Sequence, residues 1–465
     1  MSGSEPGRDR YLDLLRSIAL VRVVAYHTFA GALFSLLFPA MGVMFALAGA
    51  LMARSLRRPA AGVLRSRARR VLVPLWVYAA TVLALLVGQG WSPGADGSWG
   101  QVLLWFLPVG DPVFPESAGT GTVDPTWPVQ AGEILWYVRT YFWFMLLSPV
   151  LLRAFRARPW PVLLAPLALS GLLALGAVPL PSWADAPVTD AATYGSCWLL
   201  GFAHQSGLLR RAPRGLVLAA GPAAMVLGLW WAAGHLGGSG WDLNEIPFAQ
   251  ALWSFGFCAV LLRISPSWQE LPRPLRFLDG VVSLLNARAM TVYLWHNLLL
   301  VVTVVLIDVL WSSDLLATAV PGMLESPWLS FLLVWPLLAA VVLAVGWAED
   351  LAAGRRPRLW PVRPAPVRIV PGSPRSAGTG RVHAAPAGPA AAGSAPAGSA
   401  ADGSAAAGSP AADSAAAGTG PGAPAPVRPT GAPGFSGRSW LYPRAAREPV
   451  PPEALSPRSP GPGPG

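Results

Sequence analysis

Long apolar stretches alternate with short polar clusters along most of the chain. About ten of these stretches reach the length of roughly 20 residues that a helix needs to cross a bilayer. They fall at residues 12–31, 34–53, 71–89, 134–152, 160–178, 192–209, 215–234, 248–263, 289–309 and 327–347. A shorter apolar stretch at 101–109 is more typical of an interfacial or re-entrant segment. The pattern predicts an all-α, polytopic transmembrane bundle of about ten helices.

The loops between these stretches alternate in the sign of their charge. The segment 54–70 is rich in arginine and contains no acid, whereas the loop at about 90–133 contains acids and no base. The alternation continues to the last predicted span, after which arginine returns at 355–358. Arginine-rich loops stay on the cytoplasmic side of a membrane. We therefore expect a multi-pass protein of the plasma membrane with an even number of spans and both termini in the cytoplasm.

The composition of the chain changes after the last apolar stretch. Residues 359–465 consist largely of Ala, Pro, Gly and Ser, so they cannot bury enough apolar surface to offset the entropy of ordering. We predict a transmembrane domain at 1–358 and a disordered cytoplasmic tail at 359–465. The first apolar stretch is long enough to span and carries arginines, so we expect a mature helix there and no cleaved signal peptide.

The amino-acid composition supports a membrane location and indicates the kind of organism from which the sequence comes. Hydrophobic residues make up 53% of the chain and charged residues only 12%, about half the charge of an average soluble domain. Lysine is absent, which indicates a GC-rich, bacterial genome. The net charge of +11 does not predict a nucleic acid partner, because cytoplasmic arginine is expected in any membrane protein. Cys197 and Cys258 lie inside apolar stretches and predict neither a disulfide nor a metal site.

The first predicted span carries an unusual set of ionisable residues, at Asp13, Arg16, Arg22 and His27. His27 lies eleven positions after Arg16, which places the two within roughly 20° of one helix face and on the order of 16 Å apart along the axis. Asp13 lies within about 60° of the same face, whereas Arg22 points elsewhere, toward a neighbouring helix or into the same cavity from its side. Ionisable groups at membrane depth suggest a functional site. A purely structural alternative has Arg16 paired with Asp13 at the headgroups and His27 bonded to a backbone carbonyl.

The stretch YLDLLRSIALVRVVAYH at 11–27 resembles the first helix of the membrane-bound acyltransferase family 3. In that family Leu-Asp-x-Leu-Arg is followed by His after ten intervening residues, and Arg16 and His27 match this spacing. Further pieces resemble the family in order, and the resemblance covers about 10–350. These pieces are MFALAGALMARSL at 44–56, RSRARRVLVPLWVY at 65–78, ILWYVRTYFWFMLLSPVL at 134–151 and TVYLWHNLLL at 291–300. Two positions depart from the family: Ala48 replaces a usual Ser, and Arg22 a usual apolar residue.

The resemblance implies an O-acyltransferase of the bacterial cell envelope. Such an enzyme moves an acyl group, here expected to be acetyl, from cytoplasmic acyl-CoA to a hydroxyl of a glycan or lipid-linked acceptor. Acetyl-CoA would be a co-substrate, and we expect no bound cofactor and no metal. Arg67 and Arg70 share a helix face, and guanidinium groups bind phosphate well, so we predict that they bind the donor. An arginine-rich loop that only anchors the protein explains them equally well.

The residues of the first span suit acyl transfer to a hydroxyl. A neutral imidazole is an effective general base, and burial disfavours its charged form, so we assign His27 this role. An acyl-His27 intermediate is an alternative mechanism. Arg16 would orient the donor or stabilise the oxyanion, and Asp13 would hold Arg16. For His296, a structural hydrogen bond is the favoured role.

Two other functions fit a polytopic membrane protein. A transporter or flippase could use the charged first helix as its substrate or coupling site. Transporters often contain internal repeats, and the sequence shows none. A membrane sensor could use the Pro-rich tail to bind a partner, but the tail lacks clear repeating PxxP ligands.

Overall fold

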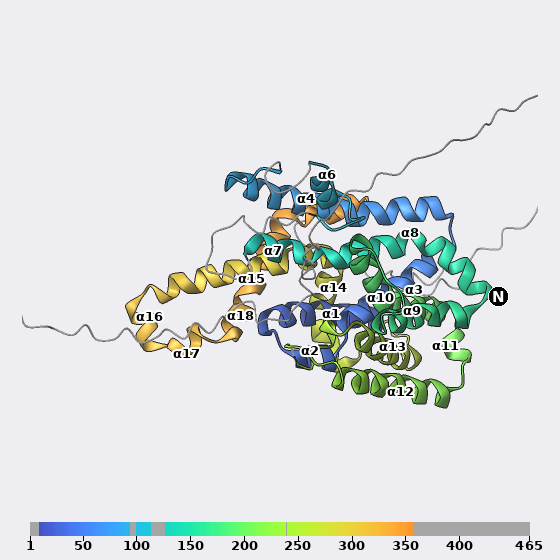
Figure 1. The fold of residues 1–465 in the computed structure, drawn as a ribbon. Coiled ribbons are helices and arrows are strands. Elements are labelled where there is room, and N and C mark those ends of the chain that lie inside the picture. The colour runs from blue at the N-terminus through green and yellow to red at the C-terminus, as the bar shows by residue number, and fades with distance from the viewer. Residues whose placement is uncertain (1–8, 94–98, 113–125, 239, 358–465) are drawn as a thin grey trace, which may run out of the picture. The chain divides into compact units, whose positions relative to one another are not determined.

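The computed structural model of the protein describes residues 9–93, 99–112, 126–238 and 240–357, and these residues form helices and no β-strand. Figure 1 shows their arrangement. The predicted tail at 359–465 lies outside the described residues, as do the acids Asp96, Glu116 and Asp124 of the acidic loop. The predicted all-α fold is confirmed.

The helices follow one another with short connections. In the first half of the chain they are α1 (Arg10–Phe29), α2 (Ala32–Leu37), α3 (Ala40–Ser55), α4 (Ala60–Gly88), α6 (Trp99–Phe106), α7 (Trp127–Glu133), α8 (Leu135–Ala157), α9 (Pro159–Ala174) and α10 (Ser182–Gln205). In the second half they are α11 (Leu208–Arg211), α12 (Arg214–Ala233), η1 (Leu243–Glu245), α13 (Pro247–Arg263), η2 (Arg273–Leu278), α14 (Asp279–Ala287), α15 (Ala289–Trp311), α16 (Asp314–Ala319), α17 (Pro321–Leu324), α18 (Pro327–Val345) and α19 (Trp347–Ala352).

Each of the predicted spans coincides with a helix, but the helices differ in how apolar they are. Within the described residues, six segments are long and apolar enough to cross a membrane: α2 with α3, α4, α7 with α8, α12, α15 and α18. The remaining predicted spans are α1, α9, α10 and α13. Helices α9 and α13 have 16 and 17 residues, and α1 carries four charged residues. The short stretch at 101–109 forms α6, where Trp76 of α4 donates a hydrogen bond to the Phe106 carbonyl at 2.8 Å.

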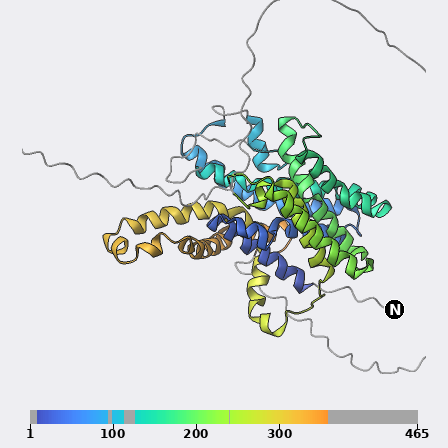
Figure 2. The same cartoon turned by 60° about the horizontal axis from the view of Figure 1, so that its bottom comes forward.

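Helix α1 is a single uninterrupted helix that other helices surround. The Asp9 side chain caps its start by accepting from the Tyr11 N–H at 3.0 Å. Ala30 ends it in the left-handed conformation at φ 45°. Between these ends α1 packs against α3, α14, α15 and α18. Figure 2 shows α15 and α18 side by side, joined by the short helices at their tip. Because α1 is enclosed, its ionisable side chains face protein and not lipid.

Two helix pairs approach so closely that only glycine fits at the contact. At Gly49 of α3 an added Cβ would overlap the Trp198 carbonyl of α10, and at Gly201 of α10 it would overlap the Ala46 carbonyl of α3. Helices α12 and α13 meet in the same way at Gly221 and Gly256. Small residues at such contacts let backbones pack closely, which is a main source of helix association in membranes.

The α3–α10 contact predicts a strong effect of adding a side chain. Gly201→Leu should abolish accumulation of folded protein, because the backbone of α3 cannot move away without opening the bundle. Gly62→Ala in α4, where nothing lies within 4 Å of the added Cβ, should leave it unchanged. The measurement is the monodisperse yield after detergent extraction and size-exclusion chromatography. A normal yield for Gly201→Leu would contradict the close packing.

Candidate functional site

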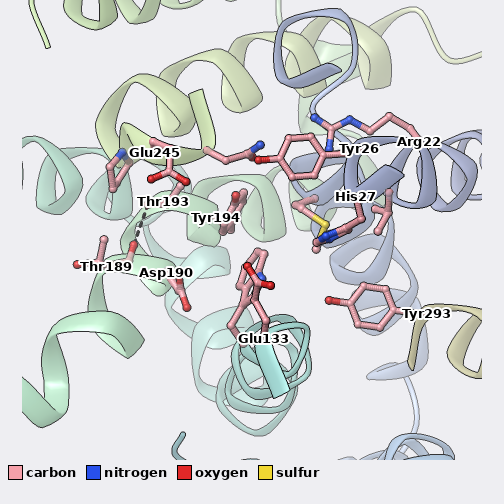
Figure 3. Close-up of a pocket in the computed structure, with 15 residues that line it drawn as sticks. Arg22, Tyr26, His27, Glu133, Thr189, Asp190, Thr193, Tyr194, Glu245 and Tyr293 are labelled. Atoms are coloured by element: carbon pink, nitrogen blue, oxygen red, sulfur yellow. Dashed lines mark hydrogen bonds between the residues drawn. The ribbon is translucent and has the colours of Figure 1, made fainter. Parts of the chain in front are cut away.

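His27 lines a cavity of about 120 Å³ between α1, α7, α10, η1 and α15. The cavity is lined by aromatic, acidic and hydroxyl side chains, which Figure 3 shows converging on one space. His27 and Tyr293 lie at the right of that view, Asp190 and Glu245 at the left, and Glu133 enters from below. The full lining is Arg22, Val23, Tyr26, His27, Met41, Glu133, Trp136, Thr189, Asp190, Thr193, Tyr194, Asn244, Glu245, Pro247 and Tyr293.

A second histidine lies beside His27. The rings of His27 and His296 are 5.0 Å apart between centroids and cross at 60°. His296 Nδ1 is 2.6 Å from the carbonyl oxygen of Tyr293, so this nitrogen carries the proton and donates it. The other nitrogen, Nε2, is buried and has no hydrogen-bond partner in the described part of the chain. The predicted structural hydrogen bond of His296 is therefore present, and the ring also faces His27.

Arg22 lies in the same cavity, although the helical periodicity placed it on a different face from His27. Its Nε donates to the Phe34 carbonyl at 3.0 Å, and its guanidinium carbon is 4.9 Å from the ring centre of Tyr26. The Tyr26 hydroxyl donates to Asp242 at 2.7 Å. These contacts hold Arg22 at the wall of the cavity, which is one of the two positions that the sequence left open for it; the choice depends on the tertiary contact with Phe34 of α2.

A larger cavity of about 390 Å³ contains the predicted donor-binding residues Arg67 and Arg70, together with Arg16, which was predicted to orient the donor or stabilise the oxyanion. The three come from α1 and α4, and Arg355 joins them from the segment after α19. The full lining is Arg16, Met44, Ala48, Leu51, Arg67, Arg70, Val71, Tyr137, Val138, Tyr141, Asn286, Ala287, Ala289, Met290, Tyr293, Glu349, Ala353 and Arg355. The structure thus brings Arg16 together with the arginines of α4 and places His27 in the other cavity.

Tyr293 lines both cavities and so lies between them. Its hydroxyl donates to the Ile134 carbonyl at 2.8 Å, and its ring is 4.9 Å from that of Tyr137. Tyr137 faces the arginine cavity, whereas its chain neighbour Trp136 faces the His27 cavity. An aromatic layer therefore separates the arginine cluster from the imidazole.

The three arginines are held to different degrees. Arg16 donates to Asn286 Oδ1 at 3.3 Å. Arg67 donates to the Leu51 carbonyl at 3.0 Å and to Ser55 Oγ at 2.8 Å, both at the end of α3. The Arg70 side chain makes no hydrogen bond or ion pair with a described residue. Arg70 is therefore the arginine most available to a ligand.

Asp13 belongs to a network at the start of α1. It forms an ion pair with Arg10 at 3.1 Å, and Arg10 also binds Asp279 of α14. Asn286 connects this network to Arg16, because its Nδ2 donates to the Asp13 carbonyl at 2.8 Å while its Oδ1 accepts from Arg16. The role of Asp13 as a direct support of Arg16 stays a prediction.

Arg139 of α8 is a buried cation that the sequence did not single out as a site residue. It binds Asp190 of α10 at 2.6 Å and also Asp111, which precedes α7. Asp190 lines the His27 cavity. Buried pairs of this kind are strongly destabilising to break, so Arg139 fixes the position of Asp190 in the cavity wall.

Glu349 is the acidic residue of the arginine cavity. Its Oε1 accepts from the Thr291 N–H and hydroxyl, both at 2.6 Å. Burial raises the pKa of Glu349 from the ordinary 4.5 to about 7, and the Thr291 hydrogen bonds oppose this only in part. Its neighbour Asp350 pairs with Arg288 at 2.7 Å. Near neutral pH, Glu349 is thus partly protonated and carries only part of a full negative charge.

The raised pKa of Glu349 predicts a pH-dependent stability. The folded protein holds a proton that the unfolded chain releases, so this group favours folding fully below pH 4.5 and loses that effect as pH rises through about 7. Glu349→Gln removes the dependence. The melting temperature of the variant should therefore rise relative to the parent between pH 5 and pH 8, measured by thermal unfolding in detergent. A constant difference across that range would contradict the raised pKa.

Comparison with known proteins identifies the family. A family model described as an acyltransferase domain, acyltransferase family 3, matches residues 9–348. The match covers most of the chain, so the chain belongs to this acyltransferase family. It includes the whole lining of the His27 cavity and all of the arginine cavity except Glu349, Ala353 and Arg355. No curated protein and no solved structure matches it. The protein is a membrane acyltransferase, and the transporter and sensor interpretations have no comparable support.

Proposed function

We propose that the protein transfers an acyl group, preferentially acetyl, from acyl-CoA to a hydroxyl of a glycan or lipid-linked acceptor. The observation that carries this proposal is the pair of cavities on either side of Tyr293. One contains Arg16, Arg67 and Arg70, and the other contains His27. The donor would bind in the arginine cavity, and the acceptor would bind beside the histidine.

The arginine cavity suits a polyanionic donor. Guanidinium groups stay charged and bind phosphate through two parallel hydrogen bonds. Four arginines line the space against a single acid, Glu349, whose raised pKa reduces its repulsion of phosphate. The loop-charge alternation predicts that this side is cytoplasmic, where acyl-CoA is available.

The His27 cavity suits an acceptor with many hydroxyl groups. Glu133, Asp190 and Glu245 provide carboxyl oxygens that can accept hydrogen bonds, and Tyr26, Trp136 and Tyr194 provide aromatic surface. This combination fits a sugar ring, whose hydroxyls need partners and whose C–H faces pack on aromatic rings. It supports a glycan acceptor over a purely apolar one.

The proposed reaction uses His27 as the general base. The imidazole takes the proton of the acceptor hydroxyl while the oxygen attacks the thioester carbonyl. The tetrahedral intermediate collapses as the C–S bond breaks, and the imidazolium returns the proton to the leaving thiolate. Arg16 acts on the donor from the arginine cavity, and Asp13 acts through the Asn286 network. In the alternative, His27 attacks the thioester first and the acyl-imidazole passes the group to the acceptor.

His296 would act as a positioning residue for His27. Its ring is 5.0 Å from that of His27, and its Nδ1–H is committed to the Tyr293 carbonyl. The unprotonated Nε2 can therefore only accept a hydrogen bond. An acceptor nitrogen beside His27 favours the orientation in which a His27 N–H points toward it and leaves the other His27 nitrogen for the substrate.

His27→Ala tests the proposed reaction. Membranes containing the parent protein should incorporate labelled acetyl groups from acetyl-CoA into an added glycan or lipid extract, and His27→Ala should lower the rate by at least about 10²-fold. His235→Ala is the matched control, because His235 is exposed and stacks on Trp231 away from both cavities. Retained activity in a correctly folded His27→Ala protein would falsify the mechanism.

Arg70→Gln tests the donor site. The expected result is a KM for acetyl-CoA raised by about tenfold with a smaller change in kcat, since one charge-assisted hydrogen bond contributes about 1.5–3 kcal/mol. Arg65→Gln is the control, because Arg65 is an exposed arginine of the same helix that lines neither cavity. Equal effects of the two changes would mean that α4 contributes only general positive charge.

A further inference from the structure

A third cavity, of about 280 Å³, lies where several helices end on one side of the bundle. It is formed by the C-terminal ends of α3, α8 and α10, the first residue of α9, and α11. It shares no lining residue with the His27 cavity or the arginine cavity. It therefore does not belong to the proposed path of the acyl group.

The third cavity has a charged rim and an apolar floor. Arg57 follows α3, Arg156 lies in the last turn of α8, and Arg211 ends α11, so the three arginines come from three separate elements. None of them forms an ion pair with a described residue, and no described acid lines the cavity. The floor contains buried apolar side chains, which are Leu152, Phe155 and Phe202.

The position of the three rim arginines is not explained by a role in orienting the protein in the membrane alone. Positive residues that only orient a membrane protein can point anywhere into the cytoplasm. Here one residue from each of three arginine clusters, far apart in sequence, faces the same hollow. Unpaired guanidinium groups that converge without an acid repel one another, which a bound anion would relieve.

We propose that this cavity binds one anionic phospholipid. The phosphate of the headgroup would lie among Arg57, Arg156 and Arg211, and the upper part of an acyl chain would cover the apolar floor. A lipid fits better than a soluble anion because the cavity combines arginine with aromatic and aliphatic surface at the ends of α3 and α8, which belong to segments long and apolar enough to span a membrane. Anionic lipids are concentrated in the cytoplasmic leaflet, which is the side that the loop charges predict for these arginines.

A bound lipid would add a shared contact between the C-terminal ends of α3, α8 and α10. Leu51 and Ser55 at the end of α3 accept hydrogen bonds from Arg67 of the arginine cavity. Ala53, between them, lines the third cavity. The end of α3 therefore forms part of the wall of both the third cavity and the arginine cavity. A lipid bound in the third cavity would thus stabilise the position of Arg67 in the arginine cavity.

The test measures lipid binding to the purified full-length protein in detergent. Native mass spectrometry with added dioleoyl phosphatidylglycerol should show one retained lipid, whereas dioleoyl phosphatidylcholine should be bound about tenfold more weakly. The triple variant Arg57→Gln/Arg156→Gln/Arg211→Gln should lose this preference. The matched control Arg58→Gln/Arg153→Gln/Arg210→Gln removes three exposed arginines from the same clusters, none of which lines the cavity, and should keep it.

The other outcomes overturn the proposal. If both triple variants lost the preference for phosphatidylglycerol equally, the lipid would be attracted only by general positive charge. If millimolar inorganic phosphate displaced the lipid, the cavity would be a site for a soluble anion. A photoreactive phosphatidylglycerol tests the parent protein without any substitution. Its crosslinks should map to residues 53–57, 152–159 and 202–211, and crosslinks spread over all cytoplasmic helix ends would also overturn the site.

Discussion

Helix α1 carries ionisable residues into the membrane-spanning region because other helices enclose it. An isolated helix with this many charges would not be stable in lipid. The enclosure depends on close packing elsewhere: α3 and α10 meet backbone to backbone at Gly49 and Gly201, and α3 in turn packs on α1. The glycine contacts thus fix the distance between α1 and α10, and the His27 cavity is the space left between them.

Buried ion pairs hold the cavity walls without being a large source of stability. Arg139 joins α8 to Asp190 of α10, and Arg288 joins the start of α15 to Asp350 of α19. The attraction within such a pair roughly offsets the cost of removing both charges from water, whereas breaking one typically costs about 3–5 kcal/mol. Asp190 itself lines the His27 cavity, and Asp350 is the chain neighbour of Glu349, which lines the arginine cavity. The two ion pairs therefore determine where these cavity walls lie.

The hydrophobic pattern located the long helices, because each of them contains a largely apolar stretch. It did not give all of their bounds, since α4 and α10 begin well before their predicted spans, and it did not predict short helices such as α14. It was less informative for the site. Arg16 and His27 share a face of α1, yet they line different cavities, since their separation along the axis places them on opposite sides of Tyr293. Arg22 lies at the His27 cavity despite its different face, because α2 packs back against α1 and offers the Phe34 carbonyl. Glu133 and Asp190 come from other helices, and only tertiary packing brings them to His27.

The aromatic layer at Tyr293 bears on how the proposed reaction could avoid moving phosphates through the membrane. If the donor phosphates remain with Arg16, Arg67 and Arg70, only the thioester end has to pass the layer. Tyr293 is held by one hydrogen bond to a carbonyl and by ring contacts with Tyr137 and His296, so opening the passage would require these aromatic side chains to rotate. The charged part of the donor would then keep its counter-ions throughout, and the acceptor would never meet the cytoplasmic side. In the proposed reaction, separating charge binding from the base in this way would let one helix, α1, serve both substrates.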